Sequence, residues 1–103
     1  MTKRRMPPND RKAQILSAAI AVAGRPGGWS KLTRTAVASE AKCADGLISK
    51  YFGTMTAFRR SIMRAAIVAE DLAVIAQGLA TGDKCAQKAD GDLKLKALAT
   101  LAG

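Results

Sequence analysis

Histidine is absent from the sequence, and the two cysteines, Cys43 and Cys85, stand far apart. A structural zinc site needs four Cys or His ligands at short spacing, so we expect no metal ion. Two isolated thiols form no disulfide framework, which favours a reducing cytoplasm. No nucleophile–base pair, phosphate-binding glycine loop or dinucleotide fingerprint occurs, so we expect neither an enzyme nor a cofactor.

Long apolar runs are missing as well. No run of about 18 apolar residues predicts a membrane-spanning helix, and the N-terminus leads into Pro7 and Pro8 rather than into an apolar signal core. Aromatic residues make up 4% of the chain, although its hydrophobic fraction is 49%. The 103 residues therefore predict one small cytoplasmic domain, not associated with a membrane, whose helices pack through small side chains.

Acidic residues are scarce in the first part of the chain. Residues 1–60 contain twelve Lys and Arg against three acids, whereas residues 61–103 contain five of each. The net charge of +9 therefore falls on the first 60 residues. A polyanionic partner follows from this distribution, and we expect double-stranded DNA in preference to RNA or an anionic membrane.

Helical patterning is abundant, and it predicts an all-α fold. Asn9 or Asp10 is expected to cap the first helix, Thr33 the second and Thr54 the fourth, and Trp29 is expected to lie in the core beneath the second. The expected helices cover about residues 9–23, 33–41, 45–52 and 55–77. Gly78, Gly82 and Gly91 are expected to break the chain after them, with a short closing helix after an Asp92 cap.

The stretch from Thr33 to Phe52 has the spacing of a helix-turn-helix. Ala38 is small at the point where two steeply crossing helices come closest, and Val37, Cys43 and Ile48 are apolar where the helices interlock. The second helix of such a pair is sized to enter a DNA major groove. This segment therefore predicts a DNA-binding protein.

The motifs of the chain, taken in order, resemble the DNA-binding half of the TetR family of bacterial repressors. They are I-L-x-A-A at Ile15–Ala19, L-T at Leu32–Thr33, V-A-x-x-A at Val37–Ala41 and G-L-I-x-x-Y-F at Gly46–Phe52. The resemblance covers roughly residues 11–62. It implies a TetR-like three-helix helix-turn-helix domain, extended by one long and one or two short C-terminal helices. It also implies a homodimeric repressor that binds a near-palindromic operator.

Several positions depart from the family pattern. Lys42 replaces the usual Gly of the turn, where φ is positive, at a cost of about 1 kcal/mol. Ala44 replaces the usual Ser cap of the second helix of the pair, the reading helix (residues 45–52), so Asp45 is expected to take over part of that role. Ser49 replaces a common Tyr on the DNA face, and Met55 replaces the Lys that opens the next helix.

The chain is also shorter than the family's repressors. Only 51 residues follow Phe52, too few to enclose an inducer pocket, so we expect no small-molecule inducer. The predicted organisation is a flexible basic arm over 1–8, a helix-turn-helix domain over 9–54, and a helical dimerisation segment over 55–103.

Helix geometry assigns the two faces of the reading helix. Ile48 faces the core, so Asp45, Ser49 and Lys50 face DNA. Asp45 either caps the helix or accepts a hydrogen bond from cytosine. Arg59 is expected to be a surface charge, with a position near the duplex as the alternative. A merely solvated surface is the alternative for these charges. The expected DNA-binding residues are Lys3, Arg4, Arg5, Thr33, Arg34, Lys42, Ala44, Asp45, Gly46, Leu47, Ser49, Lys50, Tyr51, Thr54 and Thr56.

The segment from Ala65 to about residue 77 is apolar on nearly every side. A helix of this kind needs cover on more than one face. We expect a second copy of the chain to provide it, through Ile67, Val68, Leu72, Val74, Ile75 and Leu79. The alternative is that the last segment folds back and covers the helix within one chain.

These features predict a sequence-specific transcriptional regulator, most simply a repressor. Two alternatives stay open. A nonspecific or architectural nucleic-acid-binding protein would share the charge but prefer no sequence. An interaction module would bind DNA weakly and heterodimerise with a longer relative through the fourth helix.

Overall fold

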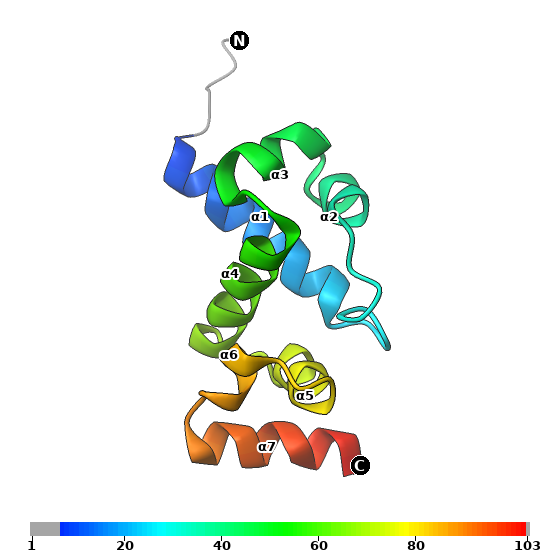
Figure 1. The fold of residues 1–103 in the computed structure, drawn as a ribbon, viewed down its shortest axis with the longest axis vertical. Coiled ribbons are helices and arrows are strands. Elements are labelled where there is room, and N and C mark those ends of the chain that lie inside the picture. Colours follow the sequence, from blue (N-terminus) through cyan, green and yellow to red (C-terminus); the bar gives the residue numbers. More distant parts are fainter. Residues whose placement is uncertain (1–6, 103) are drawn as a thin grey trace, which may run out of the picture.

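The computed structural model describes residues 7–102, which form seven helices and no strand (Figure 1). The all-α prediction is confirmed. No helix in this range is both long and apolar enough to cross a membrane. The helices are α1 (Pro8–Ala23), α2 (Arg34–Ala41), α3 (Asp45–Phe52), α4 (Met55–Val68), α5 (Leu72–Ala80), α6 (Lys84–Gln87) and α7 (Gly91–Ala102).

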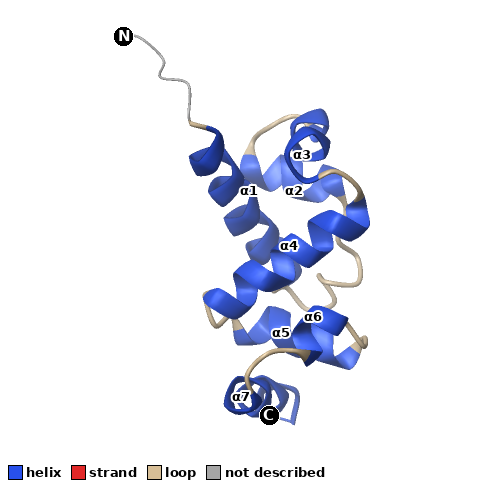
Figure 2. Ribbon diagram, turned by 60° about the vertical axis from the view of Figure 1, so that its left-hand side comes forward, coloured by secondary structure: helices blue, strands red, loops and turns tan. Residues whose placement is uncertain are grey.

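The molecule is elongated, with principal extents of 49 × 22 × 21 Å. Helices α1, α2 and α3 lie at one end and α7 at the other, as Figure 1 shows. Figure 2 shows α4 running between the first three helices and the α5–α6 pair. One apolar core continues through both ends, and its largest fully buried side chains include Ile15, Ile48, Phe58, Met63 and Ile75.

Helix α1 begins one or two residues earlier than expected, and neither Asn9 nor Asp10 caps it. Pro7 occupies the N-cap position without a side-chain hydrogen bond, and Pro8 is the first helical residue. Proline suits this position because its φ is already helical and its missing N–H would have no partner there.

The expected long helix over 55–77 is wrong, because the chain breaks into α4 and α5. Glu70 adopts a left-handed conformation with φ 54°, and the Asp71 N–H donates to the Ala66 carbonyl at 2.8 Å. Asp71 then starts α5, since its carboxylate accepts a hydrogen bond from the Val74 N–H at 3.2 Å. Glu70 and Asp71, the two polar residues within the apolar segment, therefore form the turn between α4 and α5.

The expected dimerisation surface is wrong at its centre. Val74 and Ile75 are fully buried within one chain, because α7 packs along α5 and contributes Leu93 and Ala97 to the same core. The folded-back alternative is the arrangement that the structure adopts. Of the remaining members of the expected surface, Ile67, Leu72 and Leu79 are half-buried and Val68 is 86% exposed.

Two details of the C-terminal part also differ from expectation. Gly78 does not break the chain but lies buried inside α5, where a Cβ atom would overlap Met63 Cε and stand 3.0 Å from Ala86 Cβ. Glycine therefore fits the close packing of α5 against α4 and α6, and a larger residue would require the end of Met63 to move. At α7, Asp90 rather than Asp92 accepts the first-turn hydrogen bond, from the Asp92 N–H at 3.1 Å.

The loop between α1 and α2 is fastened by two side chains from distant helices. Trp29 is buried there, as predicted. Arg59 of α4 is not a surface charge: its guanidinium donates to the carbonyls of Trp29 at 2.7 Å and Leu32 at 3.3 Å and lies 5.0 Å from the Trp29 ring centroid. Gln77 of α5 accepts from the Trp29 N–H at 2.9 Å and donates to the carbonyls of Ala23 and Arg25. These contacts hold the loop that leads into α2 against α4 and α5.

Candidate nucleic-acid interface

Helices α2 and α3 form the expected helix-turn-helix pair. Val37, Ala38 and Ala41 of α2 are buried together with Ile48 of α3, and Cys43 in the turn is half-buried. The small side chain of Ala38 lies in this contact, so the backbones of the two helices approach closely. The inner face of α3 is thereby anchored to the core.

Lys42 adopts the positive φ that the turn requires, at 58°. Its N–H donates to the Ser39 carbonyl at 3.3 Å, and the Cys43 N–H donates to the Ala38 carbonyl at 3.0 Å. This pair of bonds closes a helix end of the Schellman type, in which glycine usually holds the left-handed position. The turn therefore keeps its geometry with lysine, and the Lys42 side chain is exposed beside it.

The outer face of α3 is open to solvent, as predicted. Asp45, Gly46, Ser49 and Lys50 are exposed, and so is the preceding Ala44. Leu47, Tyr51 and Phe52 are half-buried and pack against the core. Phe52 lies against Phe58 with ring centroids 4.9 Å apart, and Lys12 lies 5.9 Å from the Tyr51 ring centroid.

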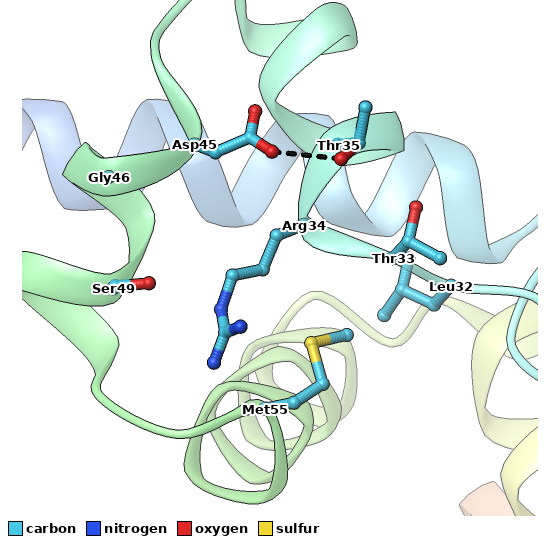
Figure 3. Close-up of a pocket in the computed structure, with 8 residues that line it drawn as sticks. All are labelled: Leu32, Thr33, Arg34, Thr35, Asp45, Gly46, Ser49 and Met55. Carbon is cyan, nitrogen blue, oxygen red and sulfur yellow. Dashed lines mark hydrogen bonds between the residues drawn. The ribbon is translucent and has the colours of Figure 1, made fainter.

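A groove of about 540 Å³ lies between α2, α3 and the start of α4, as Figure 3 shows. Five of the expected DNA-binding residues line it: Thr33, Arg34, Asp45, Gly46 and Ser49. The other lining residues, which were not among the expected contacts, are Leu32, Thr35 and Met55. The expected contacts that lie outside this groove are Lys42, Ala44, Leu47, Lys50, Tyr51, Thr54 and Thr56.

Arg34 extends from α2 across this groove toward the start of α4 (Figure 3). Its guanidinium donates to the Gly53 carbonyl at 3.3 Å, which ties α2 to the turn between α3 and α4. Its Nε atom is buried and has no hydrogen-bond partner among the described residues. The side chain therefore lies in the groove with donors still unused.

Asp45 does not cap α3, contrary to expectation. Ala44 occupies the N-cap position without a side-chain hydrogen bond, and no backbone N–H of α3 donates to the Asp45 carboxylate in the structure. Instead the Thr35 hydroxyl of α2 donates to Asp45 Oδ2 at 2.8 Å. Sequence reasoning missed Thr35, because only the crossing angle of α2 and α3 brings residues ten positions apart together.

Helix N-termini on both sides of the groove carry threonine caps. Thr33 accepts a hydrogen bond from the Ala36 N–H at 3.1 Å, and Thr54 accepts one from the Ala57 N–H at 3.1 Å. Both caps were predicted. Thr56 is exposed in the first turn of α4 and lines a separate groove beside α6.

The expected contacts Lys3, Arg4 and Arg5 lie outside the described residues. Within residues 7–102, no group of three or more Cys, Asp or Glu side chains is arranged to hold a metal ion. The sequence matches no protein-family model, and comparisons with curated proteins and with solved structures return no similar protein.

Proposed function

We propose that this protein is a sequence-specific, non-enzymatic DNA-binding regulator of the TetR type. It is most simply a cytoplasmic repressor that occupies a near-palindromic operator as a homodimer. No cofactor or small-molecule inducer enters this proposal. Each protomer inserts the outer face of α3 into a major groove, with half-sites about 34–36 Å apart or a multiple of that spacing.

One observation carries the proposal. Helix α3 is anchored by the fully buried Ile48, while its opposite face, with Asp45, Ser49 and Lys50, is polar and open beside the groove. A helix held in this way presents side chains to base edges without moving. The two capped helix starts at Thr33 and Thr54 add backbone N–H groups that favour phosphate.

The charge distribution supports the same partner. The net charge of +9 falls on residues 1–60, which include α1, α2 and α3. Lys42 and Lys50 are exposed in and after the turn. A cluster of cations around an open helix is the electrostatic footprint of a nucleic-acid-binding domain.

A second copy of the chain would bind through α7 rather than through the centre of α5. Leu95, Leu98 and Leu101 are exposed on α7, and Leu95 is 67% exposed. Helix α7 lies at the end of the molecule opposite α3 (Figure 1). A two-fold contact there leaves both α3 helices free to face one duplex.

Selection from a random duplex library tests the proposal. We expect a defined, roughly symmetric site, together with an affinity for it that depends steeply on salt. If a dimer neutralises about 6–10 phosphates, affinity falls about 10³- to 10⁵-fold between roughly 50 and 200 mM salt. A flat salt response contradicts DNA binding. Strong salt dependence without a preferred site favours the architectural alternative.

A further inference from the structure

We propose that Asp45 selects cytosine in each half-site by accepting a hydrogen bond from its N4 amino group, and that Thr35 is the positioning residue for this contact. The inference rests on the proposed DNA-binding function and identifies a base that the site prefers. Asp45 is the first residue of α3, is exposed, and lines the groove between α2 and α3.

Within the described residues, the Asp45 carboxylate has one hydrogen-bond partner, the Thr35 hydroxyl of α2. It caps no backbone N–H, and the one ion pair within the described residues joins Arg25 to Glu40. Arg34 lines the same groove but donates to the Gly53 carbonyl rather than to Asp45. Among the described residues, the Asp45 charge therefore has no cationic partner in the groove between α2 and α3.

When α3 enters the major groove of a duplex, the DNA must offer a hydrogen-bond donor to the Asp45 carboxylate, because phosphate and base acceptors repel it. The major groove exposes two such donors, the cytosine N4 and adenine N6 amino groups. Adenine places its N7 acceptor beside N6, where it faces the second carboxylate oxygen. Cytosine places a neutral C5–H there instead. The arrangement therefore favours cytosine over the other three bases.

Thr35 determines which oxygen of Asp45 is available. Its hydroxyl donates to Oδ2 at 2.8 Å from the α2 side, so Oδ1 remains to accept from a base (Figure 3). Gly46, the next residue of α3, has open space where a Cβ would stand. The N-terminal turn of α3, which reaches base edges in helix-turn-helix proteins, is thus uncrowded beside the carboxylate.

The test compares sites selected from random duplexes by the full chain and by three variants. We expect the wild-type protein to select a C·G pair in each half-site, with about tenfold or greater discrimination against other bases. Asp45→Asn should change this preference to adenine, because a carboxamide pairs with both N6 and N7. Asp45→Ala should lose the preference without gaining another. Glu70→Gln removes an equal charge from the exposed turn between α4 and α5, outside the groove and outside α7, and should change nothing.

A second pair of variants tests the positioning role. Thr35→Val should lower the cytosine preference several-fold, whereas Thr35→Ser, which keeps the hydroxyl, should retain it. Thermal melting of each variant confirms that it is folded. A defined site that is the same for wild type, Asp45→Asn and Asp45→Ala overturns the inference and leaves the proposed function standing. A wild-type protein that selects no site overturns both.

Discussion

At the scale of single residues, Lys42 holds the conformation on which the turn depends. The same closing pattern of hydrogen bonds recurs at Glu70, with φ 54°, and at Gly82, with φ 77°. Of the three positions, only Gly82 has the residue type that adopts a positive φ without strain. A left-handed conformation costs a side-chain-bearing residue about 1–2 kcal/mol.

Replacing Lys42 by glycine should therefore stabilise the fold. We expect Lys42→Gly to raise the free energy of unfolding by about 0.5–1 kcal/mol, because relief of strain exceeds the entropy that glycine loses on folding. Urea unfolding measures the change. Lys42→Ala is the matched control and should bring no gain, since it keeps a Cβ. If the glycine and alanine variants are equally stable, the positive φ at position 42 does not strain a residue that carries a Cβ.

Individual residues also show where sequence reasoning succeeds. The burial of Ile48 and Trp29, and the capping by Thr33 and Thr54, followed from local patterns. The role of Arg59 did not, because its acceptors are carbonyls 27 and 30 positions away. A long cationic side chain looks the same in sequence whether its head group lies in solvent or over an aromatic ring.

At the scale of elements, Gln77 joins α5 to the loop that precedes α2. Its carboxamide accepts from one backbone N–H and donates to two carbonyls, at 2.7 Å and 3.0 Å. The loop from Gly24 to Leu32 has little regular structure, so these bonds replace the ladder that a helix would provide. The C-terminal part thereby helps to place the helix-turn-helix.

Removing this carboxamide should loosen the loop. We expect Gln77→Ala to lower the free energy of unfolding by about 2–3 kcal/mol, because the Trp29 N–H and the Ala23 carbonyl lose partners in a half-buried setting and the exposed Arg25 carbonyl loses one as well. Gln77→Glu should recover only part of the loss, since a carboxylate accepts from Trp29 but cannot donate. Thermal and urea unfolding measure both. Gln87→Ala, at an exposed position of α6, is the control; a loss there as large as at Gln77 would show that the hydrogen bonds are not the cause.

Elements also show why the division between α4 and α5 escaped prediction. Apolar spacing continues from Phe58 to Ala76, so periodicity alone extends one helix across Glu70 and Asp71. The turn forms because Asp71 can cap α5 while Glu70 takes a left-handed conformation. A single helix would carry Val74 and Ile75 away from the position that α7 covers.

At the scale of the whole molecule, the ends have different surfaces. One end presents the polar outer face of α3, and the opposite end presents α7 with Leu95, Leu98 and Leu101 exposed (Figure 1). Exposed apolar side chains at positions 95, 98 and 101 follow one side of α7 and offer an apolar surface to a second copy of the chain. The proposed dimer therefore joins the ends that are remote from DNA.

A double substitution on α7 tests this arrangement. We expect Leu95→Lys combined with Leu98→Lys to halve the solution mass, measured by sedimentation or light scattering. It should also abolish binding to a two-half-site duplex at protein concentrations that saturate the wild-type complex, because each protomer then binds alone. Val68→Lys introduces one lysine in place of an exposed apolar side chain of α4 and should leave the mass unchanged. If Val68→Lys alone halves the mass, the contact lies at the end of α4 instead.

The sequence by itself determined the helical class, the helix-turn-helix spacing, and which face of α3 is buried. These are local properties, because periodicity, capping and turn chemistry act within about one or two helical turns. The tertiary structure alone decided that α7 covers α5, that Arg59 and Gln77 hold the loop before α2, and that Thr35 meets Asp45. Each of these depends on how helices far apart in the chain cross, and residue spacing does not encode a crossing angle.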